Sequence, residues 1–286
     1  SPDQVIERIK DANVIISNKV VLDQSNLKHA PELGLICLTA TGSNNVDKVY
    51  TKKRNIVVSN VVGYSTNSVA QHTFSLLFYL YEKLAYYDEY VKSGSYCGDS
   101  LFTHFDKTFH ELTGKTWGII GMGNIGRKVA AIASAFDCKI IYYSTSGKNT
   151  NQPYENVDFD TLVSQSDVIS IHAPLNLATE NLITYDVLSK MKKSAFLLNL
   201  GRGPIVNEGD LARALMEDLI AGAGLDVLAH EPMEDGNPLL AISDSTKLLI
   251  TPHIAWASVE ARNTVIHEVK ENILSFSKGI PRNQVN

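Results

Sequence analysis

Three short segments of the chain combine the side chains that hydride transfer to a carbonyl group requires. The segments are Asn199–Gly203, Ala229–Pro232 and Thr251–Trp256, and each follows an apolar run. A 2-keto acid needs a cation for its carboxylate, and a guanidinium can bind a carboxylate through two parallel hydrogen bonds. Its carbonyl oxygen needs a proton donor that titrates near neutral pH, which is the property of histidine. A carboxylate beside that histidine orients it and stabilises its charged form.

Arg202, His253 and Glu231 can fill these three roles. The chain has eight histidines, however, and His230 stands next to Glu231, so it competes for the role of proton donor. His172 also ends a predicted strand, where it can simply line a cofactor groove. A lone arginine after a strand is most often a surface residue. The spacing of these residues alone therefore leaves the triad open.

A glycine-rich turn with the spacing of a dinucleotide-binding motif occurs at Gly121-Met-Gly-Asn-Ile-Gly126. It follows an apolar strand and opens a predicted helix, which is the context that such a turn requires. Gly121 permits the tight turn, Gly123 lets the backbone approach a diphosphate, and Gly126 lets the helix pack close to the strand. The start of the helix then presents backbone N–H groups to the phosphates. The alternative is a glycine-rich turn without a ligand.

The elements around these motifs predict an α/β protein with doubly wound parallel sheets. Six apolar runs form the strands, and helical segments separate the first five. The predicted strands are Thr116–Ile120, Lys139–Tyr143, Val168–His172, Ala195–Asn199, Gly222–Val227 and Leu248–Ile250. The predicted helices are Ile125–Phe136, Phe159–Ser164, Tyr185–Met191 and Glu208–Asp218, the last with Asn207 as its N-cap. Ligands bind beyond the carboxyl ends of such strands, which is where the three reactive segments lie.

A second set of short buried strands is predicted near the beginning of the chain, at Val14–Ser17, Leu35–Leu38 and Ile56–Val58. A long helix without Gly or Pro is predicted at Ser68–Tyr90, where the chain crosses into a second domain. The final helix, Ser258–Lys278, is expected to return to the first. We therefore expect one domain at 1–67 plus 258–286, and a dinucleotide-binding domain at 68–257.

The bulk composition is that of an ordinary globular protein. The 286 residues are 44% hydrophobic and 20% charged, and the formal net charge is −5. Proteins that bind nucleic acids or anionic membranes need basic patches, which this mildly acidic chain does not favour. No apolar stretch is long enough to span a membrane, and the first residues lack the pattern of a signal peptide. Three scattered cysteines favour reduced thiols in a cytoplasmic protein over disulfides or a metal site.

The motifs as a set resemble those of the D-isomer-specific 2-hydroxyacid dehydrogenase family over nearly the whole chain. The matching motifs are the glycine turn, Leu200-Gly-Arg-Gly203, Gly224-Leu-Asp-Val227, Glu231-Pro232 and Pro252-His253. The glycerate dehydrogenase (hydroxypyruvate reductase) group is most similar, through Asn60–Thr66 and His253–Trp256. The resemblance implies a Rossmann cofactor domain inserted in a flavodoxin-like substrate domain. It also implies hydride transfer between NAD(P)H and a small 2-keto acid, such as hydroxypyruvate or glyoxylate, to give a D-2-hydroxy acid such as D-glycerate.

The same resemblance implies individual roles and no metal. Arg202 would bind and polarise the substrate, His253 would be the acid–base, and Glu231 would pair with His253. Thr41 and Gly42 would bind the substrate carboxylate through backbone N–H groups. The residues expected to bind the cofactor are Gly121, Gly123, Asn124, Ile125, Gly126, Ser144, Pro174, Thr179, Leu200, Gly201 and Asp226.

Ser144 bears on the choice of cofactor. NAD-binding members carry an acidic residue here, which hydrogen-bonds the adenine ribose and repels a 2′-phosphate. Thr145–Lys148 can donate hydrogen bonds to such a phosphate, but no arginine stands in this stretch. The alternative is an NAD enzyme whose ribose is held by Ser144 and backbone groups. We expect relaxed specificity between NAD and NADP.

Three alternative functions on the same fold are formate oxidation, phosphoglycerate oxidation and nicotinamide sensing. Formate dehydrogenases have Gln where this chain has Glu231, and phosphoglycerate dehydrogenases often carry a regulatory domain that this sequence does not show. A nicotinamide-sensing transcriptional corepressor on the same fold is the alternative from another class, because such proteins can retain the triad.

Family members usually begin with a further strand, so we expect one strand–loop unit upstream of Ser1. The segment Ser68–Tyr90 carries more apolar and aromatic surface than one face of a helix can bury. A helix buried on both sides between the domains is one explanation, but the resemblance favours a homodimer built around this region.

Overall fold

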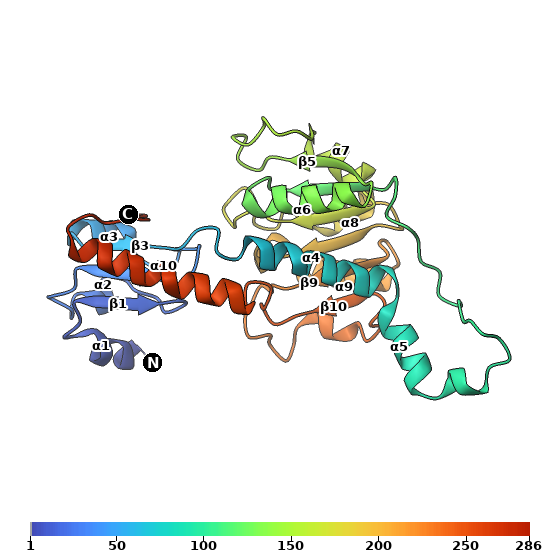
Figure 1. Ribbon diagram of the computed structural model, residues 1–286, viewed down its shortest axis with the longest axis horizontal. Helices are drawn as coiled ribbons and strands as arrows, with labels where there is room; N and C mark the ends of the chain where they lie inside the picture. Colours follow the sequence, from blue (N-terminus) through green and yellow to red (C-terminus); the bar gives the residue numbers. More distant parts are fainter. Residues whose placement is uncertain (1) are drawn as a thin grey trace. The chain divides into compact units, whose positions relative to one another are not determined.

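The computed structural model describes residues 2–286, and the chain divides into two compact units. One unit runs to Ser65 and resumes at Ala257–Asn286, and the other is Thr66–Trp256. Each is built around its own parallel sheet (Figure 1). The first boundary lies between the strands of the first predicted set and those of the second. The last helix of the chain belongs to the first unit.

The larger unit contains a seven-stranded parallel sheet in the order β10-β9-β8-β7-β4-β5-β6. The strands are β4 Thr116–Ile120, β5 Lys139–Tyr143, β6 Glu155–Asn156, β7 Val168–Ile171, β8 Phe196–Asn199, β9 Gly222–Leu225 and β10 Leu248–Ile250. The six predicted strands are confirmed to within two residues at each end. The edge strand β6 was not predicted, because two exposed polar residues carry no apolar pattern.

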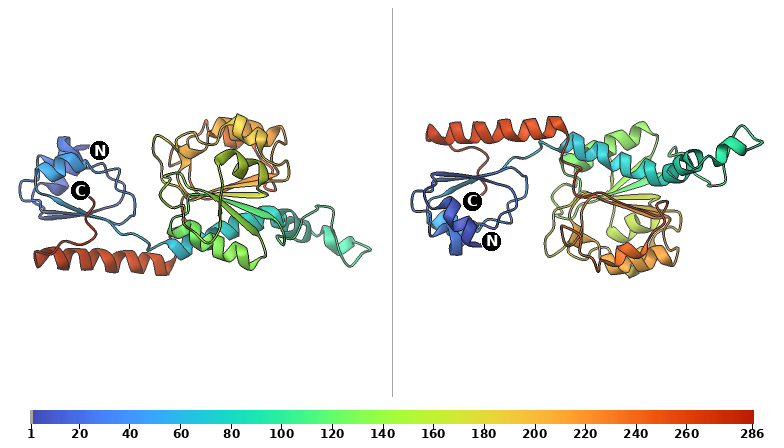
Figure 2. Two further views of the ribbon diagram at one scale, coloured as in Figure 1. Left: turned by 90° about the horizontal axis from the view of Figure 1, so that it is seen from above. Right: turned by 90° about the horizontal axis from the view of Figure 1, so that it is seen from below.

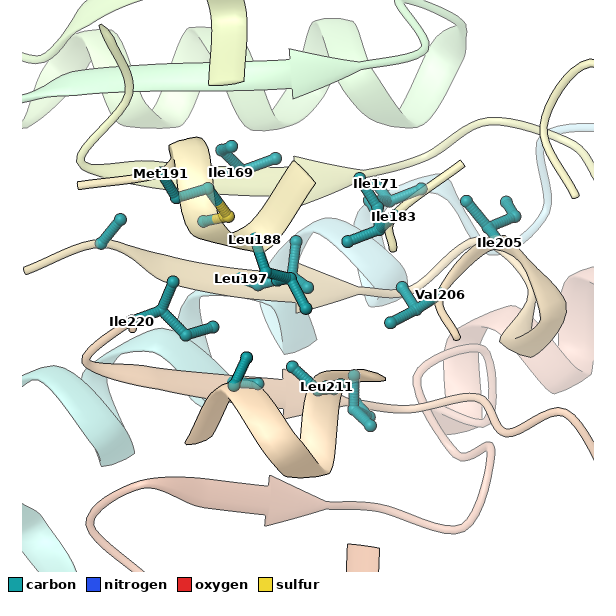
Figure 3. Packing of buried hydrophobic residues seen from close by; sticks show 14 of the residues in the cluster. Ile169, Ile171, Ile183, Leu188, Met191, Leu197, Ile205, Val206, Leu211 and Ile220 are labelled. Atoms are coloured by element: carbon teal, nitrogen blue, oxygen red, sulfur yellow. The ribbon is translucent and has the colours of Figure 1, made fainter. Parts of the chain in front are cut away.

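Helices cover both faces of this sheet (Figure 2). One face packs against α4 Thr66–Tyr81 and α6 Asn124–Ala135. The other packs against α7 Phe159–Gln165, α8 Tyr185–Lys190 and α9 Glu208–Met216. Figure 3 shows Leu188 of α8 and Leu211 of α9 beside Leu197 of the sheet. Short 3-10 turns lie at η2 Gly203–Ile205 and η3 Pro238–Ala241. The predicted N-cap of α9 is confirmed, since the Asn207 side chain accepts a hydrogen bond from the backbone N–H of Asp210.

The single long helix predicted at Ser68–Tyr90 is wrong. The structure has two helices there, α4, which ends at Tyr81, and α5 Leu84–Lys92, followed by the turn η1 Ser95–Gly98. Between them Lys83 adopts a left-handed backbone conformation, with φ of 57°. Its ammonium group donates to the carbonyl of Thr246 at 3.2 Å and lies 5.1 Å from the centre of the Phe196 ring. These tertiary contacts redirect the chain at a residue whose helix propensity is good.

The smaller unit has a three-stranded parallel sheet, β1 Val14–Ser17, β2 Leu35–Leu38 and β3 Val57–Ser59, in that order. The first two strands are as predicted, and the third is shifted by one residue. Helix α10 Val259–Ser277 packs Val265 and Val269 against one face of the sheet. The remaining helices are α1 Pro2–Ile9, α2 Gln24–Leu27 and α3 Lys48–Lys53. The strand expected upstream of Ser1 stays a prediction.

Two further observations concern membrane-spanning helices and the cysteines. Within that range, none of the helices has the length and apolar character needed to cross a bilayer. The three cysteines are unpaired thiols, and burial raises the pKa of Cys37 and of Cys138 to about 11.

Candidate active site

The glycine turn has the shape that a diphosphate requires. Gly121 has φ of 95°, and a side chain there would lie 2.8 Å from the backbone N of Ala173. A side chain on Gly126 would lie 2.3 Å from the carbonyl O of Gly121, so this glycine permits the close approach of α6 to the turn. A Cβ on Gly123, by contrast, would meet nothing within 4 Å. The space beside Gly123 at the start of α6 is therefore open, which fits the diphosphate of a dinucleotide. The Arg127 side chain folds back on the turn and donates to the carbonyl of Met122 and to the Asn124 side chain.

Ser144 lies beside this turn, directly after β5. The strand register pairs Ile120 with Tyr143, and the N–H of Gly121 donates to the carbonyl of Tyr143. The Ser144 hydroxyl is covered from solvent and has no hydrogen-bond partner among the described residues. A buried hydroxyl without a partner is costly, so a bound ribose hydroxyl would satisfy a group that this chain leaves unsatisfied.

The loop after β7 closes the other side of the turn. Ala173 packs between two glycines, because a side chain on Gly201 would lie 2.8 Å from its carbonyl O. Thr179 is buried, and its hydroxyl donates to the carbonyl of Pro174 at 2.7 Å and accepts from the N–H of Asn176. The hydroxyl of Thr179 therefore holds the loop in shape, while Pro174 itself is exposed.

Glu231 and His253 form a close pair. His253 Nδ1 lies 2.7 Å from Glu231 Oε2, and the second carboxylate oxygen accepts from the N–H of Leu228 at 3.1 Å. Because the carboxylate can only accept, Nδ1 carries the proton and Nε2 is left to face a substrate. The side chains of His253 and Glu231 are 25% and 31% exposed, so the pair is accessible.

The loop that carries His253 is held by Asp226, which is 2% exposed. One of its carboxylate oxygens accepts from the hydroxyl of Thr251 and the N–H of Ile254, and the other accepts from the N–H of Ala255. The resemblance implied that Asp226 lines the cofactor. In the structure three of its hydrogen bonds go to the loop of His253.

Arg202 lies at the start of η2 and is half-buried. One guanidinium nitrogen donates to the carbonyl of Gly201 at 2.8 Å, and none of the ion pairs among residues 2–286 includes this arginine. Its charge is therefore available to an anionic ligand. Gly203 packs directly on the next segment, because a Cβ there would lie 1.9 Å from the carbonyl C of Leu228.

The three segments leave the carboxyl ends of neighbouring strands, β8, β9 and β10. This placement brings the predicted triad to one edge of the sheet, together with Leu200 and Gly201 of the β8 end. Asn124 and Ile125 begin α6, which follows β4. In the sheet, β7 lies between β4 and β8, so these two residues follow a strand that does not neighbour β8.

The two competing histidines have different surroundings. His230 is 73% exposed, and its nearest carboxylate is that of Glu234, at 3.9 Å. Both ring nitrogens of His172 are covered and have no hydrogen-bond partner among the described residues, and burial lowers the pKa of His172 to about 3. A ring that stays neutral at pH 7 is a poor proton donor, so the geometry favours His253.

Thr41 and Gly42 belong to the smaller unit. The Thr41 hydroxyl donates to the carbonyl of Val61 at 2.9 Å, and its own carbonyl accepts from the Asn60 side chain. The role of these two residues in substrate binding stays a prediction. No group of three or more metal-ligating side chains comes together within residues 2–286.

The sequence patterns do not single out two residues of α4 that support the loop of His253. Ser68 contacts Ala255 and His72 contacts Thr251. The two residues carry no motif, and the only available signal was their spacing of four residues on one helix.

Known proteins are similar to this chain over most of its length. Residues 74–255 match the family model described as D-isomer specific 2-hydroxyacid dehydrogenase, NAD binding domain. A glycerate dehydrogenase of Methylorubrum extorquens is 38% identical, over 100% of this chain and 89% of its own length. A hydroxypyruvate reductase of Blautia hydrogenotrophica is 37% identical, over 99% of this chain and 88% of its own. A solved acyclic imino acid reductase in complex with NADPH and D-Arg has a TM-score of 0.89 and 32% identity, with 100% of this chain and 89% of that one covered.

The family model spans the glycine turn, the arginine and the histidine–glutamate pair, and the relatives extend the match over the smaller unit. The resemblance inferred from the motifs is thereby confirmed, and with it the α/β architecture and the use of NAD(P). The chain belongs to the D-isomer-specific 2-hydroxyacid dehydrogenase family, whose members are NAD-dependent oxidoreductases that interconvert 2-keto acids and D-2-hydroxy acids.

Proposed function

We propose that this chain reduces a small 2-keto acid of the hydroxypyruvate or glyoxylate type to the D-2-hydroxy acid, for example D-glycerate. The observation that carries the proposal is the 2.7 Å pair of His253 and Glu231. Arg202 follows β8, the strand next to β9, and has no carboxylate partner among the described residues. The names of the two relatives, glycerate dehydrogenase and hydroxypyruvate reductase, support this substrate class.

Each member of the triad has a distinct role. Arg202 binds the substrate carboxylate and places the carbonyl carbon where hydride, which NAD(P)H supplies when bound, can reach it. His253 delivers a proton from Nε2 to the carbonyl oxygen, because its Nδ1 faces Glu231. Glu231 keeps the ring in this orientation and stabilises its protonated form. The backbone groups of Leu228 and of the loop at 251–255 hold the pair in place.

The cofactor site follows from the turn described above. Gly121, Gly123 and Gly126 shape the cradle, and Asn124 and Ile125 supply N–H groups to the diphosphate. The Ser144 hydroxyl is the uncharged partner of the adenine ribose, and it neither repels a 2′-phosphate nor pairs with it. Relaxed specificity follows, with kcat/KM for NADPH and NADH within about a hundredfold, or roughly 2.7 kcal/mol.

We further propose a homodimer, although the segment that supports it differs from the one expected. The apolar residues of α4, including Phe74, Leu77 and Leu80, are buried within their own unit. Exposed apolar side chains lie instead on α5, at Leu84 and Val91, and after it, where Phe102 is 90% and Phe105 is 72% exposed. Such a patch on a monomer is a liability that association would remove.

Substitution of the proton donor tests the function. His253→Gln should lower kcat by about 10²–10⁴-fold, the usual contribution of general acid catalysis, and should still bind NADH. Arg202→Lys should fail as well, because an ammonium group cannot reproduce the bidentate grip. The measurement is NADH absorbance with hydroxypyruvate and with glyoxylate. A His253→Gln protein within tenfold of the wild type would show that another group donates the proton.

The same assay separates the enzyme from its main alternative. A nicotinamide-sensing corepressor on this fold would bind NADH with little turnover of either keto acid. Turnover at ordinary enzyme rates, about 1–10³ per second, supports the enzyme.

A further inference from the structure

The loop that carries His253 adopts a conformation that needs support. His253 has φ of 54°, in the left-handed region that a non-glycine residue rarely enters. Such a conformation persists where the surrounding contacts over-determine it. The buried Asp226, directly after β9, supplies one set of contacts to Thr251, Ile254 and Ala255.

Helix α4 supplies a second set of contacts. Ser68 and His72 lie one helical turn apart and so share a face of the helix. The Ser68 hydroxyl donates to the carbonyl of Ala255 at 2.5 Å, and His72 Nε2 lies 2.9 Å from the hydroxyl of Thr251. The two contacts therefore hold the loop on either side of His253.

The direction of the hydrogen bond at Thr251 follows from its single hydroxyl proton. That proton is donated to Asp226 Oδ1 at 2.7 Å, so the hydroxyl oxygen can only accept from His72. His72 must then carry a proton on Nε2, which also lies 3.6 Å from the same carboxylate oxygen. The side chain of His72 is 19% exposed, and burial lowers its pKa, while the nearby Asp226 carboxylate acts in the opposite sense.

We propose that His72 is a positioning residue for the acid–base His253. By donating to Thr251, it fixes the hydroxyl that bonds to Asp226, and the two contacts hold the loop in the left-handed conformation that points the catalytic ring toward Glu231. The inference rests on the proposed role of His253. It adds His72 of α4, which precedes His253 by 181 positions in the sequence, to the residues that position the proton donor.

Two substitutions at one position separate hydrogen bonding from packing. His72→Leu fills the space and removes the donor, whereas His72→Gln keeps an amide N–H that can reach Thr251. We expect His72→Leu to lower kcat by about 10- to 100-fold, because a misplacement of about 1 Å costs about that much. His72→Gln should recover most of this loss. The dissociation constant for NADH, measured by fluorescence, should stay within about threefold in both.

Thr73→Val is the matched control on the same helix. Thr73 is fully buried, and its hydroxyl donates to the carbonyl of Val69 within α4. This variant perturbs the helix beside His72 without removing a contact to the loop. We expect near wild-type kcat for Thr73→Val, and a pH profile of kcat/KM that changes for His72→Leu alone.

The outcomes distinguish the inference from the proposed function. If His253→Gln stays within tenfold of the wild type, the proposed function fails. If His253→Gln is inactive but His72→Leu is fully active, only the inference fails. Equal losses in His72→Leu and Thr73→Val, or no recovery with His72→Gln, would mean that His72 serves packing alone. Should His72→Leu not fold, His72→Phe takes its place in the comparison with His72→Gln, because phenylalanine fills the space and also lacks a donor.

Discussion

Gly203, next to Arg202, packs against Leu228 and Ala229 in the segment that carries Glu231. Gly203→Ala should therefore disturb both segments. Its backbone conformation is one that alanine can adopt, so the effect would be steric alone. The added Cβ would lie 1.9 Å from the carbonyl C and O of Leu228 and 2.3 Å from the N of Ala229. Ordinary contact begins at 3.4 Å, so the segments must separate by about 1.5 Å.

The size of the effect follows from what Leu228 supports. Its N–H donates to Glu231, so a shift of this segment moves the partner of His253. A misplacement of about 1 Å costs about a hundredfold, so we expect kcat/KM to fall at least that far, or by about 2.7 kcal/mol. Overpacking should also lower the free energy of unfolding by about 1–3 kcal/mol, which corresponds to several degrees in Tm.

Gly209→Ala is the matched control for this prediction. A Cβ at Gly209, in α9, would lie 3.5 Å from the Asn207 side chain, which is an ordinary contact. Alanine there should leave kcat/KM unchanged and raise the free energy of unfolding by about 0.4–1 kcal/mol. Steady-state kinetics with hydroxypyruvate and thermal unfolding measure both effects. A folded Gly203→Ala protein within fivefold of wild-type kcat/KM would refute the view that the contact aligns the two segments.

Three further predictions concern the cofactor, pH and assembly. Ser144→Asp should shift the ratio of kcat/KM toward NADH, whereas the same change at the exposed Ser146 should not; an unchanged ratio would place cofactor choice elsewhere. Because the pKa of His172 is lowered to about 3 in the folded chain, against 6.5, protonation favours the unfolded chain. Stability should therefore fall between pH 6.5 and 3 by at most about 1.4 kcal/mol per pH unit from this group, and urea unfolding of His172→Leu should show a shallower decline. Light scattering at low micromolar concentration should give twice the monomer mass, and Phe102→Ser with Phe105→Ser should lower it; a wild-type monomer would contradict the proposed dimer.

Much of the larger unit was predictable because its signals are local. Buried parallel strands are short apolar runs, and the glycine turn is defined by consecutive residues whose backbone requirements are intrinsic. Tertiary contact overrode local propensity at Lys83, where a bond to Thr246 and a contact with Phe196 end a helix that the residue types would continue. The edge strand β6 was likewise invisible, since its pairing with β5 comes from the sheet and not from its own two residues.

The sequence by itself determined the inventory of the site. It supplied the glycine turn and the presence of an arginine, a glutamate and several histidines after strands, because residue type and spacing decide which chemistry is available. Only the tertiary structure decided which histidine is paired. The order of the strands places the ends of β9 and β10 side by side, which brings Glu231 to His253 and leaves His230 exposed. Contacts between residues far apart in the sequence depend on how the sheet is assembled, and no local pattern encodes them.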